Sequence, residues 1–279
     1  TLGFADVVEV AIGADLCTVE EAHDFLKEVP EKLDWMGTSC CPAWSMMAKT
    51  LFPQFKDNIS MALTPMVITA RMVKKDHPNA RIVFIGPCAA KKLEANRKSV
   101  RSDVDFVLTF EELSRWLESA HVQLEPDMDD TEESRARFFP TAGGILKTMR
   151  EDIPGAEKYT RMAIDGVDNC IAALRDIESG KIHHCFIEMS ACVGSCIGGP
   201  VMEKYHPSPV SDYVAVAHYA GAKDFPVEQP DPLSIRKVFE PIERRNVTPS
   251  EAEIRDALRR MGKTRPEDEL NCGCLLYTS

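Results

Sequence analysis

Short apolar runs alternate with longer amphipathic stretches along most of the chain. The runs at residues 81–86 and 104–109 have the continuous hydrophobicity of buried parallel strands, and further strands are predicted at 159–164 and 184–189. The stretches between them repeat apolar residues at helical spacing. This alternation predicts an α/β fold of two lobes, each built on a small, mostly parallel sheet flanked by helices.

Helix starts and stops can be read from capping patterns and prolines. A capping-box pattern at Thr18 predicts a helix that ends at Pro30 and presents Glu21 and Asp24 on one face. A second box at Thr109 predicts another helix directly after a strand. Periodicity predicts the remaining helices at residues 44–51, 65–73, 141–149 and 169–177.

The polar and proline-rich parts set the domain organisation. Residues 121–137 are predicted to be a surface loop between the lobes, and the prolines after residue 200 argue against long helices there. A last helix is predicted with Thr248 as its cap, Glu251 closing the box and a stop at Gly262. We therefore expect one domain over 1–262 and, over 263–279, the truncated start of a further cysteine-rich segment.

Composition limits the function classes. With 44% apolar residues among 279, the chain can bury a full core. Its 44 acidic and 33 basic residues give a net charge of −11, which argues against nucleic acid or an anionic membrane surface as a partner. No apolar run approaches the roughly 18 residues of a membrane span, and no signal-peptide pattern opens the sequence, so we expect a cytoplasmic protein.

The ten cysteines are too sparse for a disulfide scaffold and cluster beside glycine and proline, which favours metal or redox chemistry. Three stretches contain the strongest candidates: TSCCPAW at 38–44, GPCAAK at 86–91 and FIEMSACVGSCIGGP at 186–200. Zinc sites usually repeat a closely spaced pair, whereas only the third stretch has one. Three separate loops can therefore converge on one centre.

Together, these stretches resemble the signature loops TSCCPxW, PCxxKxxE and ExxACxxGC of the [FeFe]-hydrogenase catalytic domain. All three occur in the family's order and spacing. A single loop would be a weak signal, but the combination is specific. The resemblance implies a metallocluster in the cleft between the two lobes.

The resemblance also implies the cofactor and its ligands. It assigns Cys41, Cys88, Cys192 and Cys196 to a [4Fe-4S] cluster, for which four thiolates are the usual ligands. Cys196 would also bridge to a two-iron subsite that carries carbon monoxide, cyanide and a dithiolate bridge, and the two parts form the H-cluster. The protein contributes ligation, a dry cavity, hydrogen bonds and a proton route.

By position in the family, Cys40 is implied to be the terminal proton carrier, and Glu21, Ser60 and Asp24 to continue the relay. Each residue also has a plainer interpretation. Cys40 can be a small buried thiol, Glu21 a helix-capping residue, Ser60 a loop hydroxyl and Asp24 a solvated carboxylate. Asp24 stands where the family usually has glutamate, which shortens one step and calls for a water.

Around the cluster, the resemblance implies that Lys91 donates to a bound cyanide, although a lone lysine is more often solvated. The other residues predicted to contact the cofactor are Pro87, Ala90, Ser190 and Met66. Gly86 and Ser190 replace family methionines, Ala90 replaces a frequent serine, and Ser195 replaces a glycine. These changes predict a roomier pocket, and changes around metal ligands typically alter a site by about 10- to 100-fold. They resemble those of the sensory branch of the family and make fast turnover doubtful.

Three functions remain open from sequence. The first is an anaerobic enzyme for reversible oxidation of hydrogen to protons and electrons, and the second is a hydrogen sensor of low turnover that feeds a downstream signalling domain. The third is a non-catalytic iron–sulfur protein, against which intact Cys40 and Lys91 argue. The expected partners are ferredoxin or an accessory iron–sulfur domain, together with hydrogenase maturation proteins.

Overall fold

The computed structural model describes residues 3–29, 31–123, 133–149, 158–202, 209–223, 235–237 and 249–265. The chain divides into two compact units, Thr1–Pro241 and Ile242–Ser279. The first unit contains every residue predicted to contact the cofactor. The cysteine-rich segment predicted at 263–279 lies almost entirely outside the described residues, and the domain assignment stays a prediction.

The described helices and strands of the first unit alternate as the hydrophobic pattern predicts. In chain order they are α1 (Ala11–Glu28), β1 (Trp35–Gly37), α2 (Pro42–Leu51), η1 (Pro53–Asn58), α3 (Pro65–Asp76), β2 (Val83–Gly86), α4 (Ala90–Ala95), β3 (Phe106–Thr109), α5 (Phe110–Ser119), η2 (Arg135–Phe138), α6 (Gly144–Thr148), β4 (Thr160–Asp165), α7 (Val167–Glu178), β5 (Cys185–Ser190), η4 (Ser195–Gly198) and α8 (Pro209–Ala220).

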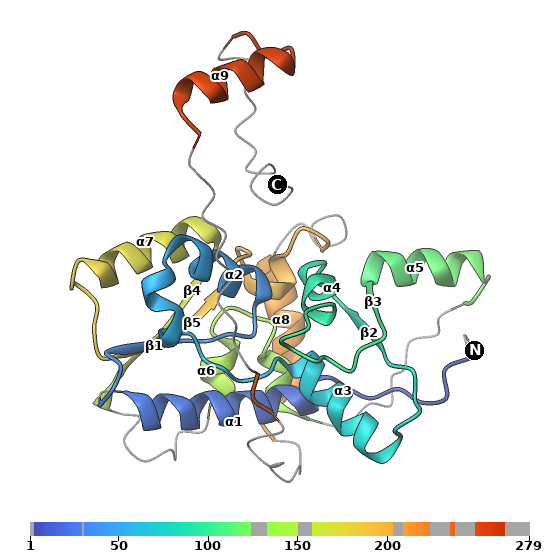
Figure 1. Cartoon of the computed structure of the whole chain (residues 1–279). Helices are drawn as coiled ribbons and strands as arrows, with labels where there is room; N and C mark the ends of the chain where they lie inside the picture. Colours follow the sequence, from blue (N-terminus) through green and yellow to red (C-terminus); the bar gives the residue numbers. More distant parts are fainter. Residues whose placement is uncertain are drawn as a thin grey trace. The chain divides into compact units, whose positions relative to one another are not determined.

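Two small parallel sheets organise this unit. The first has the order β1-β5-β4, and the second pairs β2 with β3. Figure 1 shows α2 and α7 on one side of the three-stranded sheet and α1 and α6 on the other. The predicted α/β class, with small parallel sheets flanked by helices, is confirmed. Because β1, β2 and β5 all point their carboxyl ends into cysteine loops, the topology itself supplies the candidate site.

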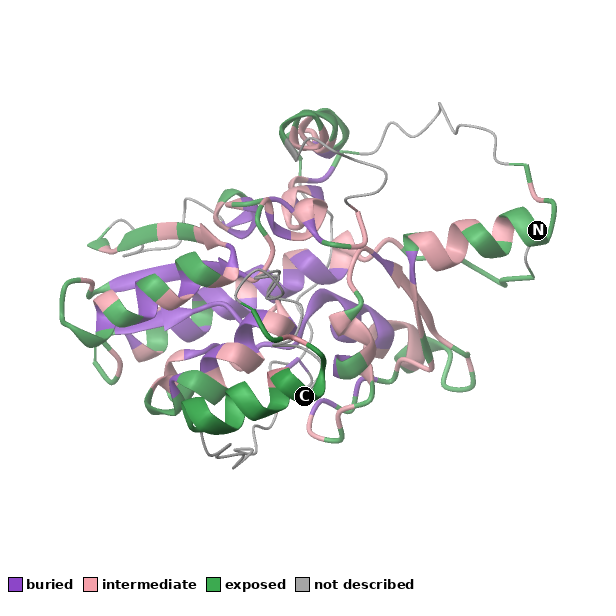
Figure 2. Ribbon diagram, turned by 90° about the horizontal axis from the view of Figure 1, so that it is seen from above, coloured by how far each residue is buried: buried purple, intermediate pink, exposed green. Residues whose placement is uncertain are grey.

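The two sheets differ in burial. All six residues of β5 are buried, whereas only Gly86 of β2 and only Thr109 of β3 are (Figure 2). Parallel strands are present within the predicted ranges 81–86 and 104–109, but their predicted burial was wrong, and Phe106 is 59% exposed. A sheet of two strands packed mainly against α4 and α5 leaves one side open, so continuous hydrophobicity alone did not indicate depth.

Helix α1 begins at Ala11, seven residues before the predicted cap. Thr18 lies inside it, is 2% exposed, and its hydroxyl lies 3.2 Å from that of Thr148. Apolar residues upstream, including Leu16 and Cys17, extend the buried face of the helix, so packing overrides the local capping pattern. By contrast, the capping box predicted at Thr109 is present at the start of α5.

Two predictions about irregular segments were wrong. Part of the predicted surface loop 121–137 forms η2, where Ser134 and Arg137 are buried and Arg137 makes a 2.7 Å ion pair with Glu9. The proline-rich stretch contains the 12-residue helix α8, which begins with Pro209. Proline is tolerated at a helix start because its missing N–H has no partner there.

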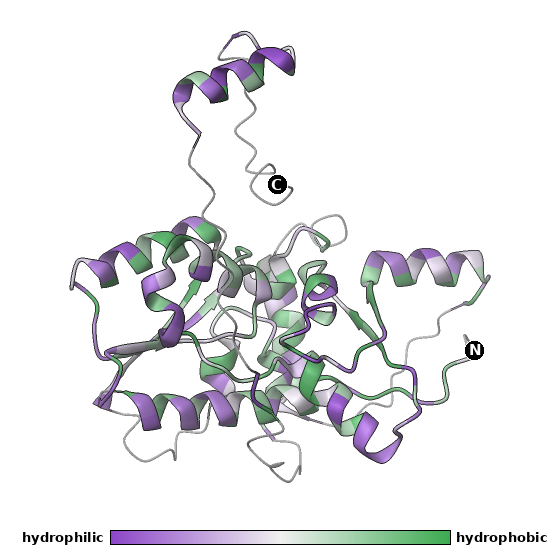
Figure 3. Cartoon of the chain, viewed as in Figure 1, coloured by the Kyte–Doolittle hydropathy of each residue, from purple (hydrophilic) through white to green (hydrophobic). Residues whose placement is uncertain are grey.

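The second unit contributes α9 (Glu251–Arg260), which is hydrophilic over most of its length (Figure 3). Its capping box is formed by Ser250 and Glu253, two residues later than predicted, and Thr248 lies outside the described residues. The predicted stop at Gly262 has a φ of 76°, typical of a helix end. Within the described ranges, no helix combines the length and hydrophobicity needed to cross a bilayer.

Candidate metal centre

The first cysteine loop is held by two polar residues that precede the cysteines. The backbone N–H of Thr38 donates to the Ile187 carbonyl at 3.0 Å, and its hydroxyl accepts from Met189 N at 3.1 Å. The next backbone N–H, of Ser39, donates to Glu21 Oε1 at 2.9 Å. Thr38 therefore attaches the first cysteine loop to β5, and Ser39 attaches it to α1.

Cys41 caps α2. Its Sγ accepts from Trp44 N at 3.4 Å, and Pro42 occupies the first helical position. The Ala191 backbone N–H, in the third loop, also donates to this thiol. A single sulfur atom is thus bound by two loops that are 150 residues apart in sequence.

The second loop joins β2 to α4 and is tied to the first by a lysine. Lys91 Nζ donates to the Cys40 carbonyl oxygen at 3.0 Å and forms a 2.7 Å ion pair with Glu94. Burial opposes the charge on Lys91, but the Glu94 carboxylate and the neighbouring thiols outweigh it and raise the pKa of Lys91. The lysine therefore remains a cation beside the cysteine loop instead of a solvated surface residue.

The third loop turns sharply after β5. Gly194 is left-handed and its N–H donates to the Asp165 carboxylate at the end of β4. A side chain placed at Gly199 would have its Cβ 3.6 Å from Cys192 Sγ and 3.7 Å from the Pro87 carbonyl oxygen. The second and third loops are therefore in direct contact at this glycine.

Ser195 has a φ of 59°, the left-handed conformation that side chains other than glycine disfavour. We expect Ser195→Gly to raise the free energy of unfolding of the cluster-free protein by about 1 kcal/mol, the steric cost less the extra chain entropy of glycine. Urea denaturation measures this change. Ser99→Gly, at a turn serine without positive φ, should not stabilise, and equal gains at both positions would contradict the account.

The four predicted ligand cysteines share one region. Among the described residues all eight cysteines are free, and the four predicted ligands are partly exposed, whereas Cys17, Cys170 and Cys185 are buried in the core. Burial is the largest cause that raises the pKa of Cys196 to about 12 and that of Cys192 to about 11, and the nearby charges of Cys41 and Cys88 contribute to both shifts. These mutual effects require the four sulfur atoms to lie near one another.

The spacing of these thiols does not suit a single metal ion. Within the described part of the chain, no three His, Cys, Asp or Glu side chains converge closely enough to hold one ion. A cubane distributes its four thiolates over four different iron atoms, so it accepts a wider arrangement. The donor set of four thiols on three loops therefore fits a [4Fe-4S] cluster.

Among the residues described near this region, Lys91 is the lysine whose raised pKa keeps it charged. Its charge lowers the pKa of Cys196, which favours the thiolate there. By contrast, burial, with repulsion from Lys237 and Arg97, lowers the pKa of Lys49 to about 6, so Lys49 is mostly neutral near pH 7. The charged Lys91 ammonium beside the four thiols fits a cofactor that carries negative charge.

Cys40 lies in a mixed environment of apolar and charged side chains. It packs against the apolar cluster that contains Cys17 and Met66. Burial raises the pKa of the Cys40 thiol, and the largest contribution from a charge comes from Glu21. Cys40 is thus placed between the cluster loop and the first carboxylate of the predicted relay.

The predicted relay residues are buried but not joined directly. Glu21 is fully buried, its Oε2 has no hydrogen-bond partner among the described residues, and burial raises its pKa to about 7. Ser60 Oγ accepts from Ala62 N at 3.1 Å, and Asp24 pairs with Arg236. No hydrogen bond within the described residues joins Ser60 to Glu21 or to Asp24.

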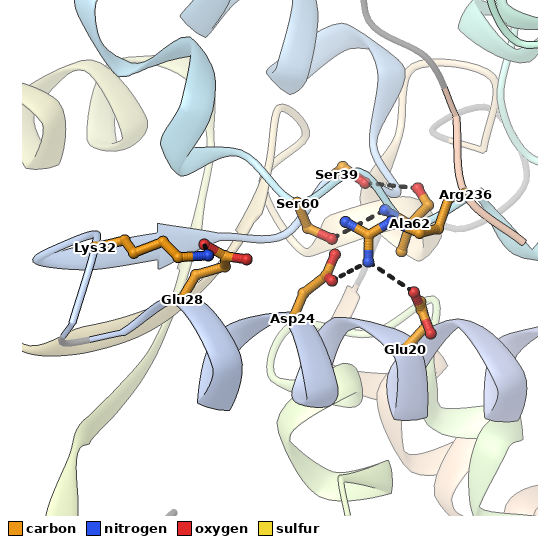
Figure 4. A network of polar contacts seen from close by, with 8 residues as sticks. All are labelled: Glu20, Asp24, Glu28, Lys32, Ser39, Ser60, Ala62 and Arg236. Atoms are coloured by element: carbon orange, nitrogen blue, oxygen red, sulfur yellow. Dashed lines mark hydrogen bonds and ion pairs between the residues drawn. The ribbon is translucent and has the colours of Figure 1, made fainter. Parts of the chain in front are cut away.

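A cavity of about 270 Å³ lies at the outer end of this series. Asp24 and Ser60 both line it, and Figure 4 shows their side chains pointing toward one another. Charged side chains and the Ser60 hydroxyl line part of this cavity, which has room for several waters. The cavity therefore offers the water that the shorter Asp24 side chain calls for.

The other predicted contact residues occupy the three loops, apart from Met66, which is 2% exposed in α3. Pro87 and Ala90 flank Cys88, and Ser190, 8% exposed, ends β5. At Gly86 the predicted extra room is absent, because an added Cβ would lie 2.6 Å from the Phe84 ring. This aromatic ring fills the space beside the glycine.

Sequence reasoning missed three charged residues near the site. Glu188 on β5 accepts from Leu146 N at 3.1 Å and from other N–H groups at the start of α6, and burial raises its pKa to about 7. The sequence did contain a signal for Glu188, because this residue occupies the first position of the third motif. Arg236 and Lys237 reach the site from a distant segment and carry no local signal.

Residues 1–200 match the family model for the iron only hydrogenase large subunit, C-terminal domain. The chain belongs to this family.

Its relatives fall into two groups. It is 26% identical to iron hydrogenase 1 of Clostridium pasteurianum over 71% of this chain and 43% of that protein, and 27% identical to the periplasmic [Fe] hydrogenase large subunit of Nitratidesulfovibrio vulgaris over 72% and 61%. It is also 25% identical to a probable cytosolic Fe-S cluster assembly factor of Aedes aegypti over 85% and 62%. The chain thus spans about half of the length of these relatives.

Solved structures agree on the fold. The [FeFe]-hydrogenase HydA1 of Chlamydomonas reinhardtii superposes with a TM-score of 0.60 at 20% identity, over 78% of this chain and 75% of that one. At this identity the likeness shows the fold alone.

Proposed function

We propose that this chain binds an H-cluster and catalyses the reversible oxidation of hydrogen to protons and electrons. The observation that carries the proposal is the setting of Cys40: a free thiol next to a ligand cysteine, beside Glu21, with the Lys91 ammonium on its carbonyl oxygen. A protein that only held a cubane would need neither the thiol nor the ammonium.

In this proposal Cys41, Cys88, Cys192 and Cys196 would hold the cubane, and Cys196 would also serve the two-iron subsite. When bound, that subsite would supply the centre at which hydrogen is split. Lys91, oriented by Glu94, would donate a charge-assisted hydrogen bond to a cyanide ligand. Pro87, Ala90, Ser190 and Met66 enclose the cofactor and limit access of water.

The chain's own residues then move the proton. The Cys40 thiol exchanges it with the subsite, and Glu21 accepts it because a carboxyl with a pKa of about 7 is half protonated near neutral pH. Ser60 and a water in the cavity connect Glu21 to Asp24. Ferredoxin or an accessory iron–sulfur domain would be the electron partner, and maturation proteins would supply the two-iron subsite.

Replacing Cys40 by alanine tests the proposal. In protein loaded with both cofactor parts, we expect Cys40→Ala to lower the rate of hydrogen–deuterium exchange between gas and water by about 10²- to 10⁴-fold, the usual contribution of a positioned proton carrier. Cys170→Ala removes a buried thiol from the core and should keep the rate. An unchanged rate in Cys40→Ala would exclude the assigned role.

A second candidate is a hydrogen sensor with low turnover. It is favoured by the changed residues next to the ligands, namely Gly86, Ala90, Ser190 and Ser195. Similarity to an iron–sulfur assembly factor supports a third candidate, which would bind the cubane alone. Slow but measurable exchange would favour the sensor, and a cubane that accepts no two-iron subsite would favour the third.

A further inference from the structure

Residues 235–237 form a short strap across the outer end of the predicted proton route. Two backbone hydrogen bonds, of 2.8 and 3.0 Å, and an antiparallel bridge join the strap to residues 61–63. The Ile235 side chain is 2% exposed and packs in the apolar cluster shared by α1 and α3. Backbone hydrogen bonds and core packing thus hold residues 235–237 against the segment that directly follows Ser60.

Arg236 extends from this strap onto two acidic residues of α1. Glu20 and Asp24 lie one turn apart on the same face of α1, and both are buried, at 2% and 3% exposure. Arg236 Nη1 contacts Glu20 Oε1 at 2.9 Å and also pairs with Asp24 Oδ1 (Figure 4). One guanidinium therefore serves as counter-charge for two adjacent buried carboxylates.

Two adjacent carboxylates without a cation do not both ionise, and they hold one proton between them. Burial and the charge of Asp24 already raise the pKa of Glu20, and Arg236 opposes this effect. A shared proton would remove Asp24 from any relay, since the carboxylate could neither accept a proton from water nor turn toward Ser60.

We propose that Arg236 is a positioning residue for proton transfer. It keeps the Glu20–Asp24 pair free of a trapped proton and fixes Asp24 through Oδ1, so that the rest of its carboxylate faces Ser60 and the cavity. The inference rests on the proposed function, because it assigns Asp24 to a proton route. Arg236 acts only through Asp24 and does not touch the cofactor.

The first test uses cluster-free protein and needs no activity. Carboxyl-carbon NMR of selectively labelled protein should show that Arg236→Gln binds about one more proton than the wild type near neutral pH, located on the Glu20–Asp24 pair. Arg236→Lys, which keeps the charge, should not bind it. Arg81→Gln removes an exposed arginine 2.9 Å from Asp105 and serves as control. An identical proton count in wild type and Arg236→Gln would overturn the proposal.

The second test uses loaded protein. Arg236→Gln should slow hydrogen–deuterium exchange with water by about tenfold or more, and Arg236→Lys should recover most of the rate. The double variant Glu20→Gln/Arg236→Gln should also recover it, because a single remaining carboxylate has no partner with which to share a proton. Failure of the double variant to recover the rate would reduce Arg236 to a purely structural role.

The tests separate this inference from the proposed function. If loaded wild-type protein shows no hydrogen exchange, the proposed function fails, while the proton count of the cluster-free variants still decides whether Arg236 prevents a shared proton. If Arg236→Gln does not fold, Arg236→Met, which also removes the charge but keeps an unbranched apolar stem of similar length, takes its place in both measurements.

Discussion

Replacing Cys196 by alanine is expected to prevent assembly of the iron–sulfur cluster. Cys196 is one of four thiols on three loops whose charges act on one another, so its loss leaves one iron without a protein ligand. Iron and labile sulfide after anaerobic reconstitution should fall at least about tenfold relative to the wild type.

The matched control is Cys185→Ala. This cysteine is fully buried in β5 and lies in the apolar core, so its replacement should cost about 1 kcal/mol of packing while iron incorporation stays at the wild-type level. Full cluster incorporation in Cys196→Ala, or equal loss in both variants, would show that the four thiols do not form one centre.

Replacing Glu21 by glutamine is expected to change both proton transfer and the pH dependence of stability. In loaded protein, hydrogen–deuterium exchange should fall by about 10²- to 10⁴-fold, because the amide cannot carry a proton between Cys40 and Ser60. The loss should appear without loss of the cluster, since Glu21 contacts the first loop through the Ser39 backbone and not through a ligand sulfur.

The stability effect has a definite sign. Burial raises the pKa of Glu21 from 4.5 to about 7, so the folded protein holds the proton more tightly than the unfolded chain does. The stabilisation from this proton is complete below about pH 4.5 and is lost as the pH rises through about 7. At 1.36 kcal/mol per pKa unit, the interval from 4.5 to about 7 corresponds to about 3 kcal/mol.

Glutamine does not titrate, so cluster-free Glu21→Gln lacks this loss of stability with rising pH. Its free energy of unfolding minus that of the wild type should therefore increase by about 3 kcal/mol between pH 4.5 and pH 8. Urea titrations across this range measure the difference. Glu118→Gln, at an exposed position of α5, should follow the wild type throughout. Parallel curves for wild type and Glu21→Gln would mean that the carboxyl is ionised in the folded protein.

The parts of the fold that local sequence specifies were predicted well. The start of α3 follows from Pro65, the start of α5 from the capping box at Thr109, and the strand end at Gly86 from the turn residues that follow, whereas α2 begins two residues and β5 ends one residue away from the prediction. The motifs also gave the loop positions of the candidate ligands. In each case the deciding interactions lie within about one helical turn of the residue.

The predictions that failed depend on distant contacts. The start of α1 is set by packing of its first half against α3, which no capping pattern at Thr18 reveals. Likewise, nothing local to Arg236 indicates that it pairs with carboxylates more than 200 residues earlier. The filling of space beside Gly86 by Phe84 depends on a side-chain conformation that a motif comparison does not include.

The proposal that this chain binds an H-cluster and reacts with hydrogen can be tested by anaerobic reconstitution with iron and sulfide, addition of a synthetic two-iron precursor, and infrared spectroscopy of the carbonyl and cyanide stretching region with and without hydrogen. We expect sharp bands that shift under hydrogen. A protein that forms the cubane but shows no such bands would contradict hydrogen chemistry and leave only iron–sulfur binding.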